Sequence, residues 1–242
     1  MLFFILTVMK ITIVYDNNAG EKSFTPSWGF ASYIEFKEIR LLFDTGGDGK
    51  ILLHNLKRAD ISPKEIKYIF LSHIHADHTG GLTELIREIG GRVTIFLPQS
   101  FPDDFKENLK DKTQLIEITH AKEILPQVWT TGELGTWIKE ESLIFDTDSG
   151  LVIITGCAHP GIVNIVSQSK NLLNKKIFLV LGGFHLVGTP PHEIKKIADE
   201  LKSLGVKRCA PCHCSGDEAQ EVCEKVFGKD FIKVGVGTVI NF

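Results

Sequence analysis

The sequence predicts an α/β fold made of two mixed sheets with helices on their outer faces. Apolar runs rich in Ile, Val and Phe are spread over the whole chain, and helical repeats lie between the later runs. The early part therefore consists mostly of strands and hairpins, whereas the later part alternates strand and helix. Two facing sheets that are covered by helices accommodate both patterns.

Apolar runs with the length and composition of strands recur along the chain. Most of them are rich in β-branched or aromatic residues and end in Gly, Pro, Asp or Ser. In chain order, the predicted strands are 10–16, 30–36, 39–43, 67–72, 93–97, 114–119, 136–146, 150–155, 176–181, 206–210 and 231–240.

Three segments carry apolar residues at helical spacing. Residues 82–89 place Leu or Ile at positions i, i+3, i+4 and i+7, and residues 194–204 and 219–226 repeat the pattern. Each segment is followed by glycine, which commonly ends a helix. A further helix is expected to begin at Gly161-Ile162.

The bulk properties indicate an ordinary globular chain. No repeat or low-complexity linker divides it, so we expect one domain over residues 1–242. The net charge is −3 and no basic run is present, so the charge pattern does not indicate nucleic-acid binding. The apolar start is too short to cross a membrane, and either Met9 is the natural start or residues 1–8 extend the first strand. A homodimer would be an ordinary assembly for such a chain.

The cysteines favour a reducing compartment. Four of the five cysteines lie within fifteen residues, whereas a secreted disulfide framework would spread them out. We therefore expect a cytoplasmic protein. The spacing Cys209-x-x-Cys212-x-Cys214 is compatible with a separate zinc or iron–sulfur site. We favour the alternative, because Cys209 lies inside a predicted strand and Cys223 lies on the apolar face of a predicted helix.

One loop concentrates metal-binding side chains. The strand 67–72 runs directly into His73, His75, Asp77 and His78. Three imidazoles and a carboxylate suit Zn²⁺, Fe or Mn²⁺. Alternation along an extended loop points His73 and His75 the same way, and the turn into the next helix frees the other two for a second ion. We expect one or two divalent ions, with zinc favoured and manganese or iron as alternatives.

Other predicted strands end at chemically active residues. Ligand sites in α/β folds form beyond the carboxyl ends of strands, so these loops are expected to converge on one cleft. His159 and His213 are either metal ligands or hydrogen-bonded loop histidines, and we favour ligands. His185 is either a ligand or a substrate-facing group. Asp44 either orients a ligand histidine or forms a turn. No role is expected for His54, His120 and His192.

The motif His73-x-His75-x-Asp77-His78, after an earlier Asp44-Thr-Gly, resembles the signature of the metallo-β-lactamase superfamily. The resemblance covers the chain from about Met9 to its end, and it implies an αβ/βα sandwich with a one- or two-metal site at one edge. Residues 156–165, 182–186 and 213–216 resemble one subgroup of metal-dependent hydrolases more closely. That subgroup includes the archaeal dihydropterin–ribofuranosylaminobenzene phosphate synthase, a pterin-linked transferase.

The resemblance also implies a set of ligands, and the chain departs from the superfamily pattern at two places. Cys157 stands where the superfamily has a bridging aspartate, and no histidine occurs near residues 131–133, where the usual third histidine would fall. His159 is expected to take over that role. Cys157 either binds the metal softly, lies beside the ligands or has no role, and we favour the second. The implied metal ligands are His73, His75, Asp77, His78, His159 and His213.

These features together predict a metal-dependent hydrolase that attacks a phosphoester or ester with a metal-bound hydroxide. Asp77 would hold the hydroxide and pass a proton to the leaving group, and His185 would face the substrate. The N–H groups at Gly161 and Ile162 would hold a phosphate. The alternatives are a pterin-linked transferase and an iron-binding redox protein without hydrolytic activity. The expected partner is a small molecule, either phosphorylated or pterin-like.

Overall fold

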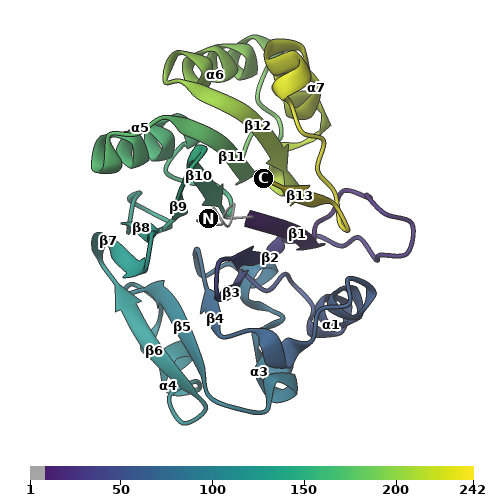
Figure 1. Ribbon diagram of the computed structural model, residues 1–242, viewed down its shortest axis with the longest axis vertical. Helices are drawn as coiled ribbons and strands as arrows, with labels where there is room; N and C mark the ends of the chain where they lie inside the picture. Colours follow the sequence, from purple (N-terminus) through teal and green to yellow (C-terminus); the bar gives the residue numbers. More distant parts are fainter. Residues whose placement is uncertain (1–8) are drawn as a thin grey trace, which may run out of the picture.

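The computed structural model describes residues 9–242, and the predictions for residues 1–8 lie outside this range. Within it the chain forms two mixed sheets that face each other, which confirms the predicted fold class (Figure 1). The first sheet has seven strands among the described residues, in the spatial order β13 (Val239–Asn241), β1 (Met9–Tyr15), β2 (Ala31–Phe36), β3 (Ile39–Phe43), β4 (Tyr68–Phe70), β5 (Val93–Pro98) and β6 (Thr113–Ile118).

The second sheet has six strands in the same part of the chain. Their spatial order is β12 (Val206–Cys212), β11 (Ile177–Gly183), β10 (Gly150–Thr155), β9 (Leu143–Thr147), β8 (Val128–Gly132) and β7 (His120–Leu125).

Both sheets contain a parallel half. Strands β3 to β6 run parallel in the first sheet, and β10 to β12 run parallel in the second. Strand β4 lies between two neighbours, with Ile69 paired to Leu42 on one side and to Ile95 on the other. Because parallel strands end at the same edge, the loops that follow β4, β10, β11 and β12 meet there.

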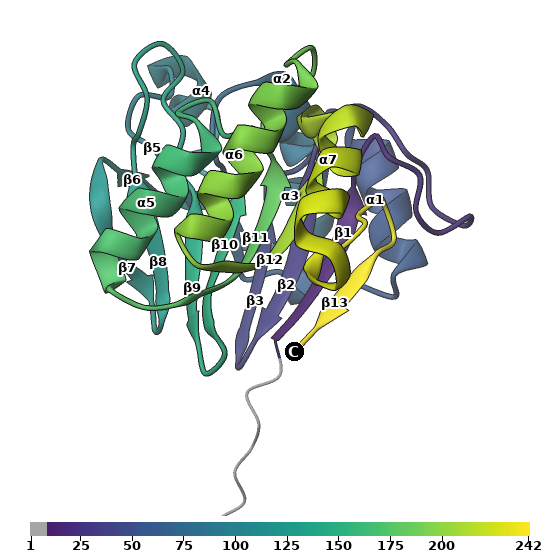
Figure 2. The ribbon, with the colours of Figure 1, turned by 90° about the horizontal axis from the view of Figure 1, so that it is seen from above.

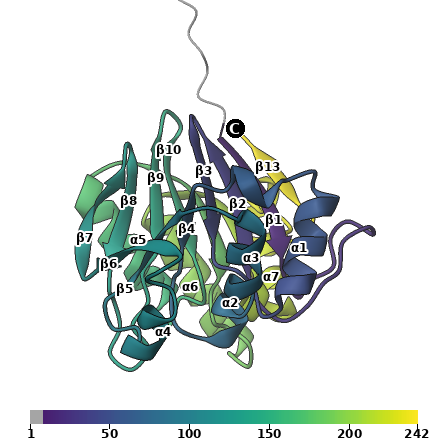
Figure 3. The same ribbon diagram turned by 90° about the horizontal axis from the view of Figure 1, so that it is seen from below.

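Helices cover the outer face of each sheet. Figure 2 shows α5, α6 and α7 side by side over the second sheet, and Figure 3 shows α1, α2 and α3 on the opposite face. No helix among residues 9–242 is both long and apolar enough to cross a membrane. The helices are α1 (Gly49–Arg58), α2 (Ala76–Thr79), α3 (Leu82–Ile89), α4 (Asp103–Glu107), α5 (Ile162–Leu173), α6 (Pro191–Ser203) and α7 (Asp217–Phe227), with short 3₁₀ turns at Pro63–Glu65, His213–Ser215 and Gly228–Asp230.

Apolar side chains fill the space between the sheets and the space under the helices. Phe36 and Phe145 meet edge to face across the sandwich, with ring centroids 5.3 Å apart. Leu85 of α3 and Ile194 of α6 are completely buried against the outer faces of the two sheets. Each fully buried side chain of this kind contributes about 1.5–3 kcal/mol. The sandwich is therefore a rigid platform for the loops at its edge.

Some predicted strands are shorter in the structure, and some elements were missed. Residues 134–140 close a loop through a bridge between Leu134 and Glu140, so β9 begins only at Leu143. The strand expected at 231–240 is reduced to β13, because glycines interrupt it. Helix α1, whose first N–H groups are capped by Asp48, and the exposed hairpin β7–β8 were not predicted.

Candidate metal centre

The loop after β4 supplies the first group of ligands. The chain stays extended through His73 and His75, and α2 then places Asp77 and His78 in its only turn. His73 and His78 are fully buried, whereas His75 and Asp77 are partly exposed. This bend in the backbone directs the two halves of the motif towards different partners.

His73 and His75 join His159, which comes from the loop after β10. Their ligand nitrogens all lie within 4.8 Å of one another. Burial and the neighbouring imidazoles lower the pKa of His73, and the same causes lower the pKa of His159 to about 4. The imidazoles are therefore neutral at pH 7, which is the form that binds metal. The Nε2 atom of His159 is buried and has no hydrogen-bond partner.

Asp77 and His78 join His213, which follows β12 directly. The Oδ2 atom of Asp77 lies 3.3 Å from Nε2 of His213 and 3.7 Å from Nε2 of His78. The 3.3 Å contact lacks the alignment of a hydrogen bond, so this His213 nitrogen is also buried without a partner. Burial opposes ionisation of Asp77, but His213 and His78 hold the pKa of this carboxyl well below its usual range.

The donor atoms of these two groups fit divalent metal ions. A buried imidazole nitrogen without a hydrogen bond is costly, and a bound cation would remove that cost. Two such nitrogens face the cluster, one in each group. Imidazole and carboxylate donors suit zinc, manganese or iron. The structure thus brings together all six residues for which the sequence predicts metal binding.

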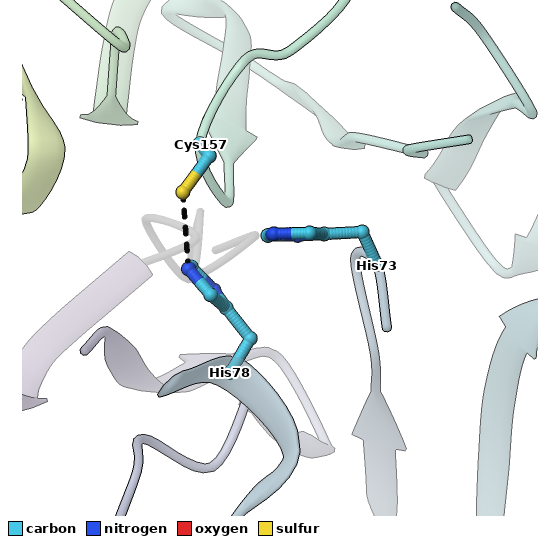
Figure 4. Close-up of side chains that lie close together, drawn as sticks. All are labelled: His73, His78 and Cys157. Carbon is cyan, nitrogen blue, oxygen red and sulfur yellow. Dashed lines mark hydrogen bonds between the residues drawn. The ribbon is translucent and has the colours of Figure 1, made fainter. Parts of the chain in front are cut away.

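Cys157 lies between the two groups. Its Sγ atom is 3.1 Å from Nε2 of His78, and the thiol also comes within 4.8 Å of a ring nitrogen of His73 (Figure 4). The loop can carry Cys157 this close to the strand end at Ser72 only because residue 156 is glycine. A Cβ atom on Gly156 would lie 2.1 Å from Oγ of Ser72. The thiol therefore lies beside one ligand histidine of each group.

Asp44 and Ser72 fix two of the ligand rings. Oδ2 of Asp44 lies 2.7 Å from Nδ1 of His78 and accepts a hydrogen bond of the same length from the Ser72 hydroxyl. That hydroxyl lies 2.9 Å from Nδ1 of His73. Burial would lower the pKa of His78, but the Asp44 carboxylate raises it. Asp44 has a φ of 54°, which is unfavourable for any residue other than glycine. The surrounding contacts must therefore maintain this backbone conformation.

Glu140 holds the whole loop after β10. Its Oε1 accepts hydrogen bonds from the N–H groups of Gly156, Cys157 and Ala158 at 3.1, 2.9 and 2.8 Å, and its Oε2 accepts one from the His159 N–H at 2.8 Å. Burial raises the pKa of Glu140 to about 7 although these donors favour its charged form. One buried carboxyl group therefore positions both Cys157 and His159.

The loop after β1 positions His213. Oδ1 of Asn17 lies 2.8 Å from Nδ1 of His213, and Oδ2 of Asp16 accepts a hydrogen bond of 3.2 Å from the His213 N–H. Trp28 lies on the same side, with its ring centroid 5.0 Å from that of His213. The exposed fraction of Trp28 is 56%, so an aromatic face is open to solvent beside the metal ligands.

His185 stands at the exposed side of the cluster. Its ring centroid is 4.5 Å from that of His159, and its φ is 55°. A hydrogen bond with Cys214 raises the pKa of His185. Cys157 and Cys214 form a buried thiol pair, and hydrogen bonds from Cys157 and His185 lower the pKa of the Cys214 thiol. The same pairing, together with burial, raises the pKa of Cys157.

The remaining expected residues lie outside this cluster or contribute only backbone. The Gly161 N–H donates to the Ala158 carbonyl, so a phosphate would have to use N–H groups from Ile162 onwards. No metal-competent group among residues 9–242 contains Cys209 or Cys212. His54, His120 and His192 are exposed on the surface.

Several site residues were not predicted from the sequence. Ser72 and Cys214 are each adjacent to a ligand histidine, and that adjacency was an available signal. Asn17 follows a predicted strand, as the ligands do. Glu140 offered no local signal, because the loop that it holds begins sixteen residues later.

Comparisons with known proteins agree with this arrangement. Residues 26–166 match the family model of the metallo-beta-lactamase superfamily. The chain is 30% identical to the 7,8-dihydropterin-6-methyl-4-(β-D-ribofuranosyl)-aminobenzene-5′-phosphate synthase of Methanocaldococcus jannaschii, over 97% of each protein.

Solved structures are similar along nearly the whole chain. The crystal structure of Tm1679, a metal-dependent hydrolase of the beta-lactamase superfamily, superposes with a TM-score of 0.80 at 26% identity and covers 96% of this chain and 98% of its own. The metallo-beta-lactamase fold protein YhfI from Bacillus subtilis shares the fold, with a TM-score of 0.70 at 16% identity over 98% of this chain and 100% of its own. The family match, the relative of similar length and the clustered histidine motif agree: this chain belongs to the metallo-β-lactamase superfamily.

Proposed function

We propose that the protein is a metal-dependent hydrolase that cleaves a phosphoester or ester bond in a small molecule. The observation that carries the proposal is the division of six buried or half-buried donors into two groups, His73–His75–His159 and Asp77–His78–His213. Two divalent ions held side by side supply a nucleophile from water at neutral pH and clamp an oxygen of the substrate. Zinc is the favoured ion, with manganese and iron as alternatives.

The roles of the protein groups follow from their positions. Asp77 is a partly exposed carboxylate at the edge of the cluster, so it can accept a proton and pass it to a leaving group. His185 faces solvent and can contact the substrate directly. Asp44 keeps the His78 ring in one orientation, which preserves the spacing of the ligands. The N–H groups from Ile162 onwards are the proposed phosphate contacts.

A pterin-linked transferase is the second candidate. Trp28 favours it, because its exposed ring beside His213 can stack against a planar heterocycle. The relative from Methanocaldococcus jannaschii is named for a product that joins a dihydropterin to an aminobenzene ring. We also propose that the chain is one domain and that the protein is cytoplasmic, since its five cysteines are free thiols.

Two reactions separate the candidates. The metal-loaded protein is assayed against bis-para-nitrophenyl phosphate and para-nitrophenyl acetate, with the His73→Ala variant as the control. It is then assayed with a 7,8-dihydropterin that carries a leaving group on its 6-methyl carbon, together with ribofuranosylaminobenzene phosphate. Hydrolysis that is lost in the variant supports the hydrolase, and coupling alone supports the transferase. A protein that binds only iron and catalyses neither reaction would refute both.

A further inference from the structure

The potential ligands among residues 9–242 form four overlapping groups, and three of these groups share no residue with one another. Besides the two groups of the proposed dinuclear centre, Cys157, His185 and Cys214 also place one donor atom each within 4.8 Å of one another. This third group, which we call the thiol triad, is the only one of the three that contains sulfur among the described residues. It lies next to the other two, because Cys157 also contacts His78 and the His185 ring lies beside that of His159.

Three successive loops of the second sheet build the thiol triad. Cys157 follows β10, His185 follows β11 and Cys214 follows β12. The Phe184 N–H donates to Oγ of Ser215 at 3.0 Å, which joins the second loop to the third. These loops belong to neighbouring parallel strands, so the sheet itself fixes the distances between the three side chains.

Close packing keeps both thiols at this point. A Cβ atom on Gly183 would lie 2.6 Å from Sγ of Cys214 and 3.2 Å from Cα of Cys157, so only glycine lets the two cysteines approach across β11. The thiol of Cys214 lies 3.7 Å from the Cys157 carbonyl oxygen. His185 has a positive φ, and this strained backbone directs its ring towards the same point.

We propose that Cys157, His185 and Cys214 bind a third metal ion, of the thiophilic class to which Zn²⁺ belongs. Ligand atoms on one tetrahedral zinc lie about 3.3–3.8 Å apart, given bond lengths of about 2.0–2.3 Å. The three donors need to move together by only about 1 Å to reach this spacing. Two sulfurs and one imidazole select a soft ion rather than Mg²⁺ or Mn²⁺. Cys157 and Cys214 are buried whereas His185 is exposed, so the fourth position faces solvent.

Cys214 distinguishes this site from an extension of the dinuclear centre. Cys157 also belongs to a group with His73 and His78, so a metal bond to Cys157 alone would not identify the third site. Cys214 and His185 occur in no other metal-competent group among residues 9–242. The proposal does not rest on the proposed function, because the ion can bind whether or not the protein is a hydrolase.

Cobalt is the probe that reports sulfur ligands directly. The full-length protein is stripped of metal under anaerobic, reducing conditions and titrated with Co²⁺, while bound cobalt and the near-ultraviolet thiolate-to-cobalt absorption are both measured. We expect the Cys214→Ser variant to bind one equivalent fewer than the wild type and to lose most of this absorption. The matched control is Cys209→Ser, which removes another buried thiol from β12, the strand that precedes Cys214, and should behave as the wild type.

Two further variants keep the test decisive. His185→Ala changes an exposed side chain, so it should lose the same equivalent of cobalt without disturbing the core. His73→Ala should lose cobalt from the proposed dinuclear centre while it keeps the thiolate absorption, which separates a failure of this site from a failure of the proposed function. Thiolate absorption that disappears in Cys157→Ser but is unchanged in both Cys214→Ser and His185→Ala would overturn the proposal. A Cys157–Cys214 disulfide in protein purified without oxygen would also overturn the proposal.

Discussion

Replacing Glu140 by Gln should loosen the loop that carries Cys157 and His159. The carboxyl group accepts four backbone hydrogen bonds, three on Oε1 and one on Oε2. A glutamine has a single oxygen, so its NH₂ group must face at least one of these N–H donors. A buried donor left without a partner costs about 1–3 kcal/mol, and loss of the charge weakens the other bonds. We expect the free energy of unfolding to fall by about 2–4 kcal/mol.

The metal site should weaken in parallel. Groups that orient metal ligands typically change affinity by about 10–100-fold, and Glu140 positions His159 through its backbone. Unfolding of the metal-free protein is followed in urea at about pH 8, where Glu140 is mostly ionised because its pKa is about 7. Zinc affinity is measured separately by competition with a chelator.

Glu141→Gln is the matched control. Glu141 is the next residue and is equally buried, but its carboxyl group accepts a hydrogen bond only from Thr130, and its Oε1 has no partner. This variant should keep the zinc affinity of the wild type. The reasoning fails if Glu140→Gln matches this control in both stability and zinc affinity.

Three further predictions follow from single side chains. Burial raises the pKa of Glu141 well above its usual value, so the folded state holds a proton that the unfolded state releases above about pH 4.5, and the free energy of unfolding falls as pH rises. Glu141→Gln should therefore stabilise the protein on the order of 1 kcal/mol at neutral pH. A urea titration that shows no gain in stability would contradict this. Asp77→Asn should slow turnover at least about a hundredfold with little change in the unfolding midpoint, and unchanged turnover would remove Asp77 from the mechanism. In a Cys214→Ser background, which already lacks the thiol triad, Cys157→Ser should keep most of the remaining metal, whereas His159→Ala should lose a substantial share. Metal analysis showing loss only in the cysteine variant would reverse that assignment.

The fold could be predicted because its signals are local. Alternating and helical repeats of apolar residues identified most strands and the helices α3, α6 and α7. Exposed elements gave weaker patterns, which is why the β7–β8 hairpin was missed: four of the six residues in β7 are exposed. The strand expected at 136–146 failed for another reason, because tertiary contacts draw Glu140 and Glu141 into the interior.

The candidate site was likewise predicted only in part from the sequence. Ligand histidines at the ends of strands are visible in the sequence, because the strand, the loop and the ligand are contiguous. Apart from Ser72, the residues that hold the ligands are far from them in the sequence: Asn17 contacts His213 across 196 positions. Such pairs depend on how the two sheets face each other, and no local pattern encodes that.

The central claim is that the His73–His75–His159 and Asp77–His78–His213 groups each hold a metal ion. Metal content per chain tests it most directly, measured by elemental analysis of the purified wild type, His73→Ala, His213→Ala and the surface control His54→Ala. Each of the first two variants should lose at least one equivalent relative to the wild type, because each removes a ligand from a different group, while the control should lose none. Unchanged metal content in both His73→Ala and His213→Ala would contradict the account.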